Sequence, residues 1–397
     1  MACGVAVALN IGKVPPSLPL LRAELGLSLV QAGWVSSTLT TLAVFGALGM
    51  GLLAARLGTL RTVMSGLLLS AAASLLALAS SRSDHGFVAL IGTRLLEGAG
   101  MMAVVVAAPG LISVAAAAGQ RRFALSLWST YMPAGAGLAM ALSPLVLPHA
   151  GWQGMWLLSA AGLLLATALT WQQRRHYIVV PAADGASVGV VAPTTLYPSA
   201  LSVLRQPTPW LLSLAFALWA LQHFALIVWL PSFLVEQRGM GPAGAALLTC
   251  AMLLACLPGN LLGGVLVQRG LSRGVQVAGA HTLTGLCAIG IFVGDWPDGL
   301  RYALCLLLSF AGGLIPSAAL SVSAALAKTP PQIGVLQGLM LQGSQLGQFI
   351  GTPLIAAAVV AAHGDWAAAR NVMAVAAALG VALGLAVLHL ERRHSGS

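Results

Sequence analysis

The sequence contains few charged residues. Only 7% of its 397 residues are Asp, Glu, Lys or Arg, against about 25% in an ordinary globular protein. Apolar residues make up 58%, so the composition excludes a soluble protein. It also excludes a disordered chain and a nucleic-acid-binding protein, although the net charge of +10 would otherwise suggest the latter. The sequence predicts a polytopic membrane protein.

Cysteine and catalytic motifs are also scarce. The five cysteines lack the Cys-x-x-Cys or Cys/His spacing of a metal site. There is no Gly-x-Ser-x-Gly turn, His-Glu-x-x-His helix or Walker loop, so hydrolysis and ATP-driven pumping lack their residues. We therefore expect neither an enzyme nor a cofactor or metal, and we expect transport to be driven by an ion gradient or by the substrate's own gradient.

Long apolar segments fill most of the chain. A helix needs about 20 apolar residues to cross the hydrocarbon core, and its backbone must be hydrogen-bonded internally. Because the N-terminus lacks the features of a signal peptide, we expect Met1 to open the first span. Twelve segments qualify as spans, at 1–21, 30–54, 62–80, 87–112, 124–147, 152–172, 209–234, 243–267, 274–294, 301–327, 336–361 and 366–390. They predict an all-α membrane protein of two six-helix bundles.

The basic residues indicate the orientation, because positive loops stay in the cytoplasm. With both termini inside, the cytoplasmic loops contain Arg56, Arg61, Arg121, Arg122, Arg174, Arg175, Arg205, Arg269, Arg273, Lys328, Arg392 and Arg393. The outer loops contain only Arg22, Arg82, Arg238, Arg301 and Arg370, each with an acidic residue nearby. The distribution predicts a multi-pass protein of the plasma membrane, here a bacterial inner membrane.

The two halves of the chain repeat at an offset of about 212 residues. Pro19 corresponds to Pro231, Arg56 to Arg269 and Gly151 to Asp365. Matches in the same order at a nearly constant offset indicate an internal duplication. The longest segment between spans is rich in proline and glycine and separates the halves. We expect an N-terminal bundle at 1–172, a central cytoplasmic linker at 173–208 and a C-terminal bundle at 209–397.

Two motifs resemble those of the major facilitator superfamily. Gly51-Leu52-Leu53-Ala54-Ala55-Arg56-Leu57-Gly58, followed by Arg61, resembles the signature after the second span, although Ala55 stands where the family has Asp. Arg94-Leu95-Leu96-Glu97-Gly98-Ala99-Gly100 resembles the fourth-span motif. The resemblance covers nearly the whole chain. It implies alternating access, with spans 1, 4, 7 and 10 lining a central cavity. The implied conformational motif comprises Gly51, Arg56, Gly58, Arg61, Gly264, Arg269 and Arg273.

A weaker resemblance points to one branch of that superfamily. The stretches Arg121-Arg122-Phe123, Leu127-Trp128-Ser129 and Pro133-Ala134-Gly135-Ala136-Gly137 are similar to those of the cyanate and nitroimidazole permeases. The glycine- and proline-rich motif of many drug antiporters is present only in degraded form, around Met132-Pro133.

Three charged residues lie well inside the predicted spans: Lys13, Arg94 and Glu97. Each costs about 2.5–3.5 kcal/mol to insert, so each needs a partner or a function. By helix rise, Lys13 and Arg94 both lie roughly 10 Å from the outer ends of their spans. Glu97 is one turn from Arg94 on the same face. Two cations against one carboxylate leave a net positive site, which predicts that Lys13 and Arg94 bind an anionic substrate.

Further polar residues extend this predicted site. We expect Asn10, Gln222, His223, Gln342 and Gln345 to contribute to substrate binding, and Glu97 or His223 to carry a coupling proton. Each residue also has a structural alternative. Arg94 and Glu97 can form a purely structural pair, Lys13 can extend toward the interface, His223 can be a satisfied polar residue, and the amide side chains can join helices.

The leading hypothesis is a secondary transporter, working as a monomer, that takes up a small organic or pseudohalide anion with a proton. The alternative is a proton-driven exporter of drugs or metabolites that uses Glu97 as its proton site. A sensor or a membrane-embedded enzyme is disfavoured, because the sequence has neither an appended signalling domain nor a nucleophile and base pair. Substrate identity, coupling ion and direction are left open.

Overall fold

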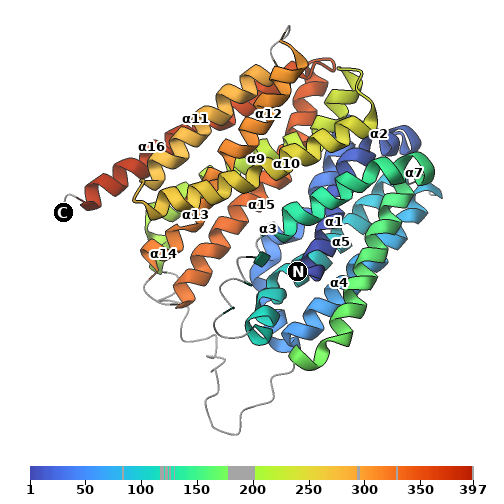
Figure 1. Cartoon of the computed structure of the whole chain (residues 1–397), viewed down its shortest axis with the longest axis horizontal. Coiled ribbons are helices and arrows are strands. Elements are labelled where there is room, and N and C mark those ends of the chain that lie inside the picture. Colours follow the sequence, from blue (N-terminus) through green and yellow to red (C-terminus); the bar gives the residue numbers. More distant parts are fainter. Residues whose placement is uncertain are drawn as a thin grey trace.

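A computed structural model describes residues 1–82, 85–116, 120, 124, 127–128, 130–177, 202–292, 296–327 and 330–395. These residues form helices and the turns between them, which confirms the all-α prediction (Figure 1). Ten helical segments in this part of the chain are long and apolar enough to cross a membrane. The motif at Arg121-Arg122-Phe123, Lys328 of the loops, and residues 178–201 of the predicted linker lie outside the described residues.

The helices of the first half form one bundle, coloured blue to green in Figure 1. They are α1 (Ala2–Gly12), α2 (Val14–Leu25), α3 (Leu29–Leu57), α4 (Thr59–Leu76), η1 (Ala77–Arg82), α5 (Gly86–Ala115) and α7 (Tyr131–Gln172). The first predicted span corresponds to α1 with α2, and the third to α4 with η1. The fifth and sixth spans are both in α7, which is interrupted by non-helical backbone at Gly151.

The helices of the second half form the other bundle, coloured yellow to red in Figure 1. They are α9 (Pro207–Glu236), α10 (Pro242–Gln268), α11 (Arg273–Ile291), α12 (Asp298–Gly312), α13 (Leu314–Leu320), α14 (Val322–Leu326), α15 (Pro330–Ala361) and α16 (Ala367–Ser395). The tenth predicted span corresponds to α12, α13 and α14 in succession. Short 3-10 helices, η2 (Arg174–Tyr177) and η3 (Ser202–Arg205), lie between the two bundles in the sequence.

The backbone supports the duplication seen in the sequence. Residues with positive φ recur in pairs at offsets of 212 or 213, and the two members of each pair have nearly the same angle. The pairs are Gly26 (61°) with Gly239 (63°), Gly58 (88°) with Gly270 (88°), and Gly151 (56°) with His363 (55°). Because L-residues other than glycine rarely adopt such angles, the agreement does not follow from apolar composition. The two halves share their turns as well as their spans.

Alanine at Gly58 or Gly270 is expected to destabilise the protein through backbone strain alone. A Cβ atom at either position meets nothing within 4 Å, so only the positive φ opposes it, at about 1–2 kcal/mol. We expect the melting temperature in detergent to fall by about 2 °C. Gly264→Ala is the matched control, because its Cβ is equally unobstructed and it lies inside α10. Equal melting temperatures for the three variants would contradict the prediction.

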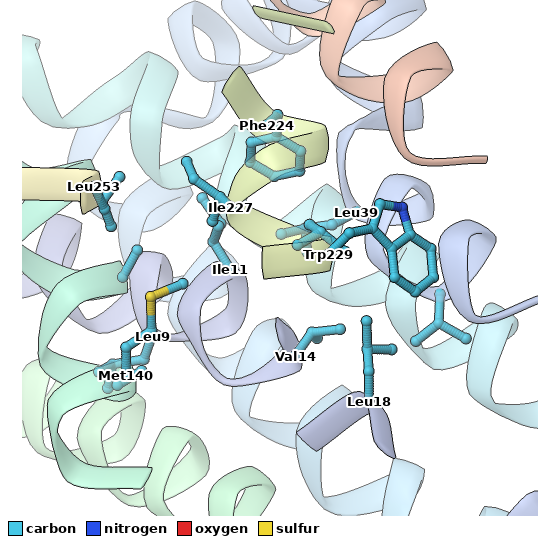
Figure 2. Close-up of a cluster of buried hydrophobic side chains, with 14 of the residues drawn as sticks. Leu9, Ile11, Val14, Leu18, Leu39, Met140, Phe224, Ile227, Trp229 and Leu253 are labelled. Atoms are coloured by element: carbon cyan, nitrogen blue, oxygen red, sulfur yellow. The ribbon is translucent and has the colours of Figure 1, made fainter. Parts of the chain in front are cut away.

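Among the described residues, the buried apolar cluster that joins the two bundles reaches the second bundle near one end. We define the linker end as the end where α7 finishes and α9 begins, and the closed end as the one where α2 and α9 finish. One buried cluster unites the first bundle with residues of the second bundle near the closed end, including Phe224–Leu234 of α9. A separate cluster, including Leu212, Phe216 and Trp219 of α9, lies within the second bundle near the linker end. Figure 2 shows Ile227 and Leu253 of the second bundle near Leu9, Ile11 and Met140 of the first.

Polar contacts also cross between the bundles. An Arg22 guanidinium nitrogen lies 2.8 Å from a Glu236 carboxylate oxygen, at the ends of α2 and α9. Farther into the interface, the hydroxyls of Ser37 on α3 and Thr352 on α15 are 2.8 Å apart. The thiol of Cys250 on α10 donates to a carbonyl of α7. The structure therefore shows a conformation in which the bundles are sealed together at the closed end.

Candidate functional site

The three ionisable residues of the predicted spans meet in one buried cluster, which we call the charge cluster: Lys13, Arg94 and Glu97. The Lys13 ammonium donates to one oxygen of the Glu97 carboxylate at 2.7 Å. Nη1 of Arg94 donates to the other oxygen. None of the three side chains is more than 1% exposed. A single carboxylate therefore bridges both cations, and the three ionised groups carry a net charge of +1.

Lys13 lies where the first span is interrupted, between α1 and α2. Pro15 and Pro16 follow it, and because proline has no N–H, the carbonyls of Ile11 and Gly12 lose their helical donors. The hydroxyl of Ser17 donates to the Lys13 carbonyl at 2.6 Å. The sequence thus places the ammonium at the least regular point of its span.

Neutral groups complete the coordination of Lys13. Its ammonium also donates to Oδ1 of Asn10 at 2.8 Å and to the hydroxyl of Ser74 at 3.1 Å, so its three protons have three acceptors. Ser74 in turn donates to Glu97 at 2.6 Å. The ring of Trp156 lies 4.5 Å from the ammonium, a cation–π distance. Sequence reasoning missed Ser74 and Trp156, since nothing local distinguishes them from other serines and tryptophans in apolar spans.

Arg94 links its helix to two others. Its Nε donates to the carbonyl of Val35 on α3, and Nη1 donates to the carbonyl of Asn10 on α1, each at 3.0 Å. The cluster is therefore assembled from α1, α3, α4, α5 and α7, inside the first bundle. The predicted pair of Arg94 with Glu97 is present, and Lys13 is buried rather than extended toward the interface. In this conformation neither cation is open to solvent.

His223 lies in a second polar site, in the other bundle. Its Nε2 is 2.9 Å from the hydroxyl of Ser309 on α12, and its ring stacks on Trp219 with centroids 4.7 Å apart. Ser309 follows Glu97 by 212 residues, so the two polar sites occupy corresponding positions of the repeat. The neighbouring Gln222 is fully buried, and its Oε1 has no hydrogen-bond partner. Its Nε2 donates to a carbonyl one turn earlier.

The two predicted glutamines of α15, Gln342 and Gln345, have different surroundings. Gln342 is exposed, and its Nε2 is 3.5 Å from the carbonyl of Val44 on α3. Gln345 is half-buried, and its Oε1 is a buried acceptor without a partner. Among the described residues, Asn10 is the one predicted polar neighbour that bonds directly to the charge cluster, while Gln222, His223, Gln342 and Gln345 are placed elsewhere.

The two copies of the implied conformational motif have different surroundings. Gly51 lies in α3, Gly58 ends that helix, and Arg56 and Arg61 are exposed. In the second half, Gly264 lies in α10 and Arg269 is exposed at its end. Arg273, however, is held by Glu391 of α16 at 3.1 Å, and its Nε donates to the hydroxyl of Ser321 at 2.9 Å. This latch joins α11 to α16.

The charge cluster joins two cationic side chains to one carboxylate. In the part of the chain that the structure describes, no group of three His, Cys, Asp or Glu side chains is placed to hold a metal ion. A double helical bundle that encloses paired charges within its apolar spans is the construction of a membrane transport protein.

The comparisons with known proteins agree with this class. A family model of the Major Facilitator Superfamily matches residues 1–352, and the chain belongs to this family. It is similar to the crystal structure of a bacterial homologue of the human lysosomal transporter Spinster, in an inward-facing and occupied conformation. That match has 16% identity and a TM-score of 0.77, and covers 98% of this chain and 96% of the other.

A second solved structure has the same fold. A point mutant of the nucleoside transporter NupG matches with 14% identity and a TM-score of 0.74, covering 98% of each chain. No curated protein sequence matches the chain significantly. Membership of the superfamily supports secondary transport across a membrane and indicates a transporter rather than an enzyme.

Proposed function

We propose that this protein takes up a small organic or pseudohalide anion together with a proton, and that Glu97 and the substrate compete for Lys13 and Arg94. One observation carries the proposal: a single buried carboxylate is shared by two buried cations. Glu97 thus occupies the place that an anion would take. Carboxylates and flat anions match the donors of a guanidinium, and an ammonium adds a compact charge.

Charge counting gives the coupling. With Glu97 ionised, the cluster carries +1. A proton on Glu97 raises this to +2, which strengthens the attraction for an anion, and a bound monovalent anion returns the cluster to +1. Loss of the proton restores the bridging carboxylate and expels the anion. Proton and substrate therefore travel together, because Glu97 and the anion compete for the same two cations: the state with both and the state with neither each give Lys13 and Arg94 one anionic partner, whereas the proton alone leaves the cluster at +2 in a low-dielectric interior.

The rest of the proposal concerns orientation and conformation. We propose that the linker end and both termini lie in the cytoplasm of a bacterium, which the basic loops support. The sealed closed end then faces outward, and this conformation is inward-facing. The interruption at Lys13 provides a bending point in the first span. We propose that Asn10, Gln222, His223, Gln342 and Gln345 line the substrate path as the bundles move, and that 173–208 connects bundles at 1–172 and 209–397 in a working monomer.

Glu97→Gln tests the coupling. The amide mimics the protonated acid, so we expect anion binding and anion exchange to continue while uptake driven by a pH gradient falls by more than tenfold. Sodium cyanate, formate, acetate and lactate, each compared with chloride, would first be screened for thermal stabilisation of the detergent-purified protein. The radiolabelled form of the best anion would then be followed into proteoliposomes with and without an acid exterior.

Two further variants keep the test decisive. Asp298→Asn removes an exposed carboxylate that pairs with Arg238 within the second bundle and is expected to retain pH-driven uptake. Glu97→Gln leaves two neighbouring cations without a counter-charge. The double variant Lys13→Met/Glu97→Gln restores the original net charge of the cluster, and we expect it to bind the anion more weakly and to show the same loss of coupling. Wild-type accumulation by either Glu97 variant overturns the proposal. Net efflux of an uncharged or cationic drug that is driven by protons moving inward favours the exporter instead.

A further inference from the structure

A large groove lies at the linker end of the second bundle, away from the charge cluster. Its volume is about 970 Å³, and it is bounded by the end of α10, the start of α11, α14 and the end of α16. Leu271, Leu326 and Leu388 contribute to an apolar wall, and Arg273, Glu391 and Arg392 form a polar edge. The groove therefore offers an apolar surface and a charged one to the same occupant.

The charges at this edge favour an anion. Arg273 and Arg392 line the groove beside Glu391, and Arg269 and Arg393 are exposed on the adjoining loop and helix. Four arginines against one glutamate give this region a net charge of +3. Basic pockets at the ends of membrane helices attract anionic lipid headgroups, by about 1 kcal/mol for each Lys or Arg near the surface.

The arginine at the centre of this edge is held in place. Nη1 of Arg273 donates to Glu391 at 3.1 Å, and its Nε donates to Ser321 at 2.9 Å. Glu391 also accepts from the hydroxyl of Ser272 and from the backbone N–H of Gly274, so it caps α11. The Arg273 side chain is still 24% exposed. A ligand phosphate would thus meet an ordered donor rather than a freely rotating side chain, which reduces the entropy lost on binding.

The position of the groove at the membrane interface indicates that its anion is an amphiphile. Its walls are the ends of α10, α11 and α16, three helices long and apolar enough to cross the membrane, so it opens where hydrocarbon gives way to headgroups. α16 continues to Ser395, beyond the predicted span that ends at 390, and this extension carries Glu391 and Arg392 past the apolar segment. A soluble anion would leave the leucine wall uncovered. An amphiphile covers the wall with its chain and pairs with the arginines through its head.

We propose that the groove binds an anionic phospholipid, with its phosphate at Arg273 and Arg392 and an acyl chain along Leu271, Leu326 and Leu388. The bound lipid bridges the connection between α10 and α11, where Arg269 and Arg273 of the second copy of the conformational motif lie, to the end of α16. The lipid proposal is independent of the anion proposed for the charge cluster, so either one can be wrong without affecting the other.

The test compares lipids on the full chain in dodecyl maltoside. Palmitoyl-oleoyl phosphatidylglycerol, the matching phosphatidylcholine and inorganic phosphate would be titrated, with retained lipid read by native mass spectrometry and stability by thermal unfolding. We expect at least about tenfold preferential retention of phosphatidylglycerol, equivalent to about 1.4 kcal/mol, and a rise in melting temperature that phosphate alone does not produce. Equal retention of the two lipids, or equal protection by phosphate, overturns the proposal.

Variants locate the binding to this groove. Arg273→Gln is expected to remove most of the lipid preference. Arg238→Gln is the matched control, because Arg238 is likewise paired with a carboxylate and 32% exposed but lies near the closed end. Leu326→Trp fills the groove without changing charge and is also expected to lower retention, so the test survives if Arg273→Gln fails to fold. Retention unchanged in Leu326→Trp, or lowered equally by Arg238→Gln, contradicts the assignment.

Discussion

Replacing Arg94 with alanine is expected to reduce uptake of the substrate anion by at least about a hundredfold while leaving the protein inserted in the membrane. The charge cluster then falls from +1 to zero, because Lys13 and Glu97 remain as a neutral pair with their mutual hydrogen bond. An anion entering this variant faces no surplus positive charge. Uptake of the radiolabelled anion into proteoliposomes, normalised to the amount of reconstituted protein, measures the loss.

Folding of this variant is expected to be weakened but retained. Truncation removes the hydrogen bonds to the carbonyls of Val35 and Asn10, and each lost bond from a charged donor costs about 1.5–3 kcal/mol. Arg94→Lys restores the charge without the planar fork, so we expect partial recovery of uptake. Arg238→Ala removes an exposed paired arginine and should transport normally. Substantial uptake by a well-folded Arg94→Ala protein would exclude the competition between Glu97 and substrate.

Joining the bundles at the closed end is expected to stop transport completely and reversibly. The hydroxyls of Ser37 and Thr352 lie 2.8 Å apart on α3 and α15, so Ser37→Cys/Thr352→Cys places two thiols face to face across the interface. Alternating access requires these helices to separate when the closed end opens. We expect copper phenanthroline to abolish uptake by the double variant and dithiothreitol to restore it.

A crosslink within one bundle supplies the control. The thiol of Cys3 is 3.1 Å from the hydroxyl of Thr170, and both residues belong to the first bundle. Thr170→Cys therefore creates a pair whose oxidation leaves the bundles free to move, and uptake should persist. The single variants Ser37→Cys and Thr352→Cys should be insensitive to oxidant. Transport by a double variant whose disulfide is verified by mass spectrometry would show that this interface does not open.

Much of the fold could be predicted from the sequence, because each helix that crosses the hydrocarbon core needs about 20 apolar residues, and such segments can be recognised along the chain. Apolar length identified the spans, and matching residues at a nearly constant offset identified the repeat, which the positive φ angles of Gly58 and Gly270 support. The separation of the tenth span into α12, α13 and α14 could not be predicted, since it depends on packing around Gly312 and Gly313 rather than on any break in hydrophobicity.

The candidate site was only partly predictable for a similar reason. Arg94 and Glu97 lie one turn apart on a single helix, so local geometry sufficed to pair them. The contacts of Glu97 with Lys13 and Ser74 join residues 84 and 23 positions apart, and they depend on how three helices pack. His223 bonds to Ser309 in its own bundle. This contact could not be predicted, because the depth of a residue along its span does not determine which bundle its side chain faces.

The net charge of the buried cluster links the protein to the membrane voltage. A unit charge that crosses the whole membrane field changes in energy by about 2.3 kcal/mol per 100 mV. Lys13, Arg94 and Glu97 are fixed to the first bundle, so rocking that shifts them through about a tenth of the field contributes about 0.2 kcal/mol at that voltage. The balance between the two orientations of the empty carrier is therefore set partly by the electrical state of the cell.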